Sequence, residues 1–67
     1  MTTREILIAN GVRNLKEFGY PGVTKENILT DPIYREFFIG NLEGWSSHPK
    51  VAADVYLLLK ELEGRSQ

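Results

Sequence analysis

The sequence predicts an all-α fold, a small bundle of about four helices in the order long, short, central, long. Apolar residues recur at three- and four-residue spacing in several segments, which is the pattern of amphipathic helices. Capping residues precede these segments and glycines follow them. No alternating run is long enough to indicate a strand, and the chain carries no repeat or low-complexity segment. We therefore expect one helical domain over residues 1–67.

The first long helix is expected to begin after Thr2 and to run to about Phe18. Thr2 and Glu5 form a capping-box pattern, in which each side chain satisfies a backbone N–H of the other residue. Gly19 should end the helix. Ile6 falls on the polar side, where we expect it to be exposed. One broad apolar face is formed by Leu7, Ile8, Gly11, Val12, Leu15 and Phe18.

A short helix over about residues 25 to 29 is expected after the turn Tyr20-Pro21-Gly22. Thr24 is placed to cap it, and Val23 and Ile28 have the spacing of a hydrophobic staple. A helix of one or two turns contributes little core of its own. Its expected role is to set the angle at which the central helix begins.

The central helix is expected over about residues 32 to 43. Asp31 is a capping residue, Pro32 suits the first helical position, and Gly44 should end the helix in a left-handed conformation. Gly40 either permits a close helix approach or marks a frayed last turn. A helix with this many apolar sides must pack on more than one side, against both flanks of the chain or a second copy. Its apolar residues are Ile33, Tyr34, Phe37, Phe38, Ile39 and Leu42.

The last long helix is expected to start at His48 or Pro49 and to reach Glu63. Ser47 is a suitable cap, and Gly64 should end the helix. Its apolar stripe comprises Val51, Ala52, Val55, Tyr56, Leu58, Leu59 and Leu62.

Composition bounds how this small chain builds a core. It has 67 residues and no cysteine, so disulfides and thiolate metal sites cannot supplement the core. An apolar content of 42% then favours wide apolar faces or an oligomer, although a small monomer with one core is equally consistent. Charges of both signs are interspersed, with a net charge of −1. With neither a signal-peptide pattern nor a membrane-length apolar run, we expect a cytoplasmic protein without a membrane partner.

The residues of the chain do not assemble a known catalytic pattern. One histidine and no cysteine make a metal site improbable, and we expect no cofactor. Ser46, Ser47 and His48 are neighbours in sequence, but a nucleophile and its base also need a spatial hydrogen bond and an orienting third group. The glycines do not form a phosphate-binding run ahead of a helix. We therefore expect a non-enzymatic protein with no catalytic residue.

Binding to protein is the function that this composition favours. Trp45, Phe38, Tyr34 and Leu57 are the candidate partner-binding residues, because aromatic and aliphatic side chains are typical interface anchors. Leu57 lies apart from the apolar stripe of its helix. Trp45 and Phe38 could instead close the core. The expected partner is another protein or a second copy in a homodimer.

The alternative function is that of a nucleic-acid-associated regulator. The short helix, tight connection and central helix have the order of a helix-turn-helix. The central helix, however, offers only Arg35 to a groove, whereas phosphate binding needs several basic residues on one face. Nucleic acid is therefore an unlikely partner.

The segment from Leu15 to Asp31, followed by Tyr34 and Phe37-Phe38, resembles small uncharacterised proteins of tailed phages and prophages. The resemblance covers the middle of the chain. It implies a bacterial cytoplasmic setting and a role as an accessory or host-interacting protein. It implies no catalytic or binding residue.

Overall fold

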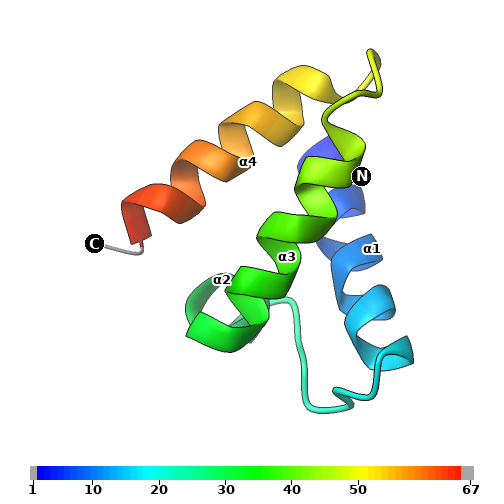
Figure 1. Ribbon diagram of the computed structural model, residues 1–67, viewed down its shortest axis with the longest axis vertical. Helices are drawn as coiled ribbons and strands as arrows, with labels where there is room; N and C mark the ends of the chain where they lie inside the picture. The colour runs from blue at the N-terminus through cyan, green and yellow to red at the C-terminus, as the bar shows by residue number, and fades with distance from the viewer. Residues whose placement is uncertain (1, 66–67) are drawn as a thin grey trace.

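Four helices make up the protein in a computed structural model that describes residues 2–65. No strand occurs within this range, so the predicted all-α order of long, short, central and long helices is confirmed. Figure 1 shows α3 in the middle of the view with α2 at its lower end, and both α1 and α4 pack against α3 and against each other. The bounds are α1 (Thr3–Glu17), α2 (Asn27–Thr30), α3 (Pro32–Trp45) and α4 (Ala52–Arg65).

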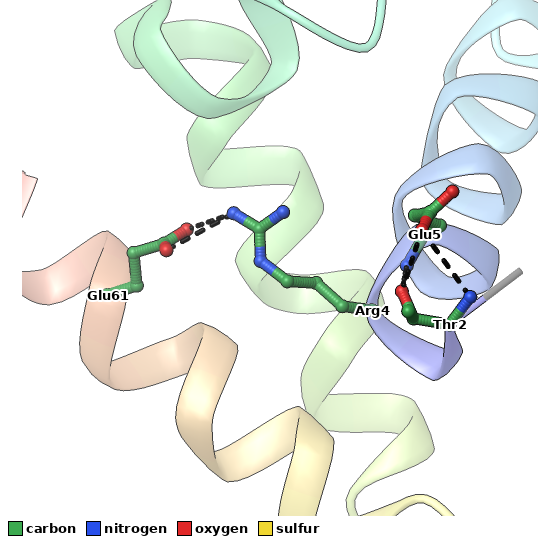
Figure 2. Close-up of polar contacts among 4 residues, drawn as sticks. All are labelled: Thr2, Arg4, Glu5 and Glu61. Atoms are coloured by element: carbon green, nitrogen blue, oxygen red, sulfur yellow. Dashed lines mark hydrogen bonds and ion pairs between the residues drawn. The ribbon is translucent and has the colours of Figure 1, made fainter.

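Both ends of α1 follow the prediction. The Glu5 N–H donates to Thr2 Oγ1 at 3.2 Å, and the Thr2 N–H donates to Glu5 Oε1 at 3.5 Å, which completes the capping box (Figure 2). At the other end Gly19 has a φ of 104°, a conformation that side chains with a Cβ rarely adopt. The Tyr20 N–H then donates to the carbonyl of Leu15 at 3.0 Å. Gly19 therefore turns the chain away from the helix.

The short helix α2 begins two residues later than expected. The N-cap of α2 is Glu26, which makes no side-chain cap hydrogen bond, so the predicted Thr24 cap is wrong; the Thr24 hydroxyl instead accepts the Asn27 N–H at 3.1 Å while Asn27 Oδ1 accepts the Thr24 N–H at 2.7 Å. This reciprocal pair encloses a turn, and regular helix follows only from Asn27. Val23 and Ile28, the expected staple residues, are both fully buried in the core.

The start of α3 is confirmed and its predicted end is wrong. Asp31 Oδ1 accepts the N–H groups of Ile33 at 2.9 Å and Tyr34 at 3.2 Å. The helix does not stop at Gly44, which lacks a left-handed conformation, but continues to Trp45. Ser46 is the C-cap of α3, and its hydroxyl donates to the Glu43 carbonyl at 2.6 Å.

The last helix starts later than predicted. His48 and Val51 take part in successive turns, whose N–H groups donate to the carbonyls of Trp45 at 3.0 Å and His48 at 3.1 Å. Regular helix begins at Ala52, too far from Ser47 for that side chain to cap the first turn. Pro49 accounts for the delay, because a proline disfavours helical geometry in the residue before it.

The predicted stop at Gly64 is also wrong, because α4 extends through this residue to Arg65. Near the same end, Arg4 Nη2 contacts Glu61 Oε2 at 2.8 Å and so links α1 to α4 (Figure 2). Both side chains are partly exposed, and an ion pair of this kind stabilises a fold by less than about 1 kcal/mol.

The core lies where the four helices meet, and every helix contributes to it. Phe38 and Leu42 of α3 are completely buried, so the central helix is covered by the rest of one chain on its core side. The buried apolar residues are Leu7, Ile8, Leu15, Val23, Ile28, Phe38, Leu42, Val55, Leu58 and Leu62. Tyr20 packs at the edge of this core.

A glycine does permit a close helix approach, but it is Gly11 rather than Gly40. A Cβ built on Gly11 would lie 2.7 Å from Cδ1 and 2.8 Å from Cε1 of Phe38, and 3.1 Å from Cδ1 of Ile28. A Cβ on Gly40 would meet nothing within 4 Å, so both explanations offered for Gly40 fail. It lies mid-helix on an open surface.

Replacing Gly11 by alanine should show the cost of this contact. Gly11→Ala and Gly40→Ala gain the same helix propensity, about 1 kcal/mol, but only the first forces a methyl group against Phe38. We expect Gly11→Ala to be about 1–3 kcal/mol less stable than Gly40→Ala in urea unfolding followed by circular dichroism. Equal stability of the two variants would contradict the close approach of α1 and α3.

Substitutions of Asp31 test the hydrogen bonds that cap the start of α3. Asp31→Ala removes the acceptor of two first-turn N–H groups and should lower the free energy of unfolding by about 1 kcal/mol. Asp31→Asn keeps a side-chain oxygen and should retain most of the stability in the same urea titration. An equal loss in both variants would assign the effect to the carboxylate charge instead of the hydrogen bonds.

Candidate protein-binding surface

The four predicted partner-binding residues do not form one surface. Phe38 is 0% exposed, so its predicted place on a binding surface is wrong; it faces Gly11 in the core. Tyr34 and Trp45 are partly buried against the core. Leu57 is 68% exposed, as its position off the apolar stripe indicated. It borders a small hollow beside the Arg4–Glu61 ion pair.

Trp45 borders a different hollow, close to the first turns of α1. Ile6, Arg13 and Val51 also line this hollow, whose volume is about 380 Å³. The Trp45 ring lies 5.5 Å from the His48 ring, measured between centroids. Ile6 is exposed, as predicted. Trp45 thus lines the hollow as a partly buried side chain.

Two phenylalanines that the apolar pattern placed in helix faces are exposed in the structure. Phe18 is 76% exposed and Phe37 is 42% exposed. Their ring centroids lie 6.5 Å apart, although the residues come from the end of α1 and the middle of α3. Ile33, one helical turn before Phe37, is 62% exposed. We refer to Phe18, Ile33 and Phe37 as the docking face.

A row of aromatic rings connects the docking face to the core edge. Tyr20 lies 5.1 Å from Phe37 and 6.0 Å from Tyr34 between ring centroids, the latter pair edge to face. Such ring pairs stabilise by about 0.5–1.5 kcal/mol beyond the area they bury. The contact with Tyr20 therefore restrains the Phe37 ring, while part of this ring stays exposed to solvent.

A groove between α1 and α3 adjoins the two phenylalanines. Its volume is about 380 Å³, within the range of about 300–1,000 Å³ found for ligand and side-chain pockets. No residue of α2 or α4 borders it. The α1/α3 groove is lined mainly by Gly11, Leu15, Phe18, Phe37, Gly40 and Asn41. It is thus a largely apolar hollow with exposed rings at its side.

Asn41 is the exception in this apolar lining. Its Oδ1 is buried and has no hydrogen-bond partner within the described residues. An acceptor left in this state costs about 1–3 kcal/mol. The wall of the groove therefore carries a buried oxygen to which no residue of 2–65 donates a hydrogen bond.

The side chains considered for catalysis have other contacts. Ser46 donates its hydroxyl to the Glu43 carbonyl, and the His48 ring lies against Trp45. Residues 2–65 contain no group of three His, Cys, Asp or Glu side chains that could hold a metal ion. Over the same residues, no helix has both the length and the apolar character to cross a membrane.

No family model, curated protein or solved structure matches this chain. The resemblance to small phage and prophage proteins accordingly stays a prediction.

Stability measurements should separate the exposed phenylalanine from the buried one. Phe18→Ala should cost less than about 1 kcal/mol, because most of the ring is already in water. Phe38→Ala empties a completely buried site and should cost about 3–5 kcal/mol, enough to unfold many domains of this size. Urea unfolding of both variants provides the comparison. If the two variants lost similar free energies of unfolding, Phe18 would belong to the core and the docking face would not exist.

Proposed function

We propose that this chain is a non-enzymatic protein-interaction module that binds its partner through the docking face and the α1/α3 groove. The observation that carries the proposal is the pairing of Phe18 and Phe37, two exposed rings from separate helices beside an apolar hollow. Aromatic side chains next to a pocket are typical of the residues that dominate binding energy.

The docking face is a modest apolar patch. At about 150–250 Å² per aromatic side chain, the open parts of Phe18 and Phe37 together expose roughly 240 Å². Ile33 adds to the same side of α3, one turn away. The largest apolar patch of a typical monomer covers about 300–600 Å² and is often functional, so the position of the docking face beside the groove supports this function more than its area does.

Protein is favoured over nucleic acid by the charges around α3. Arg35, the single basic residue of this helix, is partly buried, and its guanidinium donates to the Thr30 carbonyl at 3.4 Å. Glu36 and Glu43 are both exposed on the same helix. Carboxylates on the exposed surface repel phosphates, so a regulator that reads DNA with α3 has little support.

Site-specific photo-crosslinking tests the proposal directly. A benzophenone amino acid replaces Phe18 or Phe37 in the full chain, and the cells are irradiated; Lys25, exposed in the turn before α2, serves as the control position. We expect discrete protein adducts from positions 18 and 37 and none from position 25. Adducts that contain a second copy of the chain would also support protein binding.

Two results would contradict the proposal. One is the absence of any discrete adduct at both aromatic positions. The other is an adduct that nuclease removes and protease digestion of the partner does not, which would assign the surface to nucleic acid.

A further inference from the structure

We infer that the partner element of this surface is a basic amphipathic helix, which inserts an apolar side chain into the α1/α3 groove and places lysines or arginines along its acidic margin. The inference rests on the proposed function and specifies the chemistry of the partner. Its grounds are the shape of the groove, the charges beside it and the small area of the docking face.

The outer side of α3 carries two glycines where the groove opens. Gly40 lines the groove, and a Cβ at Gly40 or Gly44 would meet nothing within 4 Å. The two glycines are four residues apart, so they lie on one face of the helix. A docking helix can therefore approach the α3 backbone closely between Phe37 and the helix end.

Carboxylates flank this opening on α3. Glu36 lines the groove, and Glu43 lies seven residues later on the same side as Gly40 and Gly44. On α1, Glu17 does not line the groove and shares its helix face with Arg13, four residues before it. All three glutamates are exposed, and none makes an ion pair within residues 2–65.

Basic residues are absent from the groove side. No lysine or arginine lines the groove, and helical spacing places Lys16 and Arg35 on other sides of α1 and α3. Arg35 is engaged with the Thr30 carbonyl. The surface thus presents an apolar centre with an acidic margin, and its complement is an apolar side chain with cationic neighbours.

A helix fits this surface better than a second copy of the chain. The groove side of α1 runs from Gly11 to Phe18, which corresponds to about 10 Å or two helical turns. The two phenylalanines expose roughly 240 Å², so a stable dimer, which buries ~800 Å² per partner, would need much further surface outside the groove. A symmetric dimer through this face would also bring the Glu36 and Glu43 side chains of both copies together, which like charge disfavours. Binding in the helix-in-groove mode satisfies all three constraints.

Three synthetic helical peptides of about 15 residues test the charge and the apolar anchor separately. The first has leucines at i, i+3, i+4 and i+7 with lysines beside them, the second has glutamate for each lysine, and the third has alanine for each leucine. Each is titrated into the ¹⁵N-labelled full chain. We expect the first to shift the amide signals of Gly40 and Phe37, and the other two to bind at least about tenfold more weakly.

Two leucine variants show whether binding uses the groove. Gly40→Leu puts a side chain at the mouth of the α1/α3 groove, where a Cβ meets nothing within 4 Å. This variant should bind the first peptide at least about tenfold more weakly than the wild type does. Gly64→Leu is the matched control, since this glycine is also exposed in a helix, meets nothing within 4 Å and lies outside the groove. The Gly64→Leu variant should bind the first peptide with the affinity of the wild type. Unfolding curves of both variants verify that the fold persists.

The inference is overturned if the glutamate peptide binds as well as the lysine peptide, if Gly40→Leu binds as the wild type does, or if no peptide binds. These outcomes leave the proposed function standing when positions 18 and 37 still give protein adducts. If the sole adduct is a second copy of the chain, the basic helix is wrong and the docking face is a self-association surface. If no adduct forms, the proposed function itself fails.

Discussion

The contact between Gly11 and Phe38 is the constraint on which the rest of this fold depends. With no side chain on Gly11, the Phe38 ring occupies the place of the missing Cβ, and Ile28 reaches the same point from α2. Three helices are thereby fixed to one another at a single position. The same approach of α1 to α3 brings Phe18 within 6.5 Å of Phe37 and forms the walls of the groove. The core contact thus determines the surface beside it.

The starts of α1 and α3 were predictable because they depend on neighbouring residues. The Thr2–Glu5 capping box and the Asp31 cap form between side chains and amides two or three positions apart, so the sequence alone identifies them. Helix ends were less predictable. Gly19 adopts the left-handed conformation, whereas Gly44 remains helical because Ser46 satisfies the Glu43 carbonyl instead. A glycine permits a stop but does not require one.

The candidate surface was harder to predict, since helical spacing does not say which part of a wide apolar arc faces the core. Phe37 and Phe38 are adjacent, yet only Phe38 is fully buried, because the crossing point of α1 is set by Gly11. Phe18 continues the apolar face of α1, but it lies at the end of the helix where the chain turns away at Gly19. Leu57 was predictable as an exposed residue from its place off the stripe. The pairing of Phe18 with Phe37 follows from tertiary packing alone.

The open side of α1 and α3 is a consequence of how the helices are distributed. Val55, Leu58 and Leu62 place α4 against the core, where it contacts both α1 and α3, but none of its residues borders the α1/α3 groove. The remaining helix, α2, has four residues and reaches only the lower end of α3. No described element is left to cover the groove, although the core itself is complete. A chain with a closed core and one uncovered helix pair can fold alone and still accept a further helix. The carboxylates of Glu36 and Glu43 then favour a basic segment over a second acidic copy of the same face.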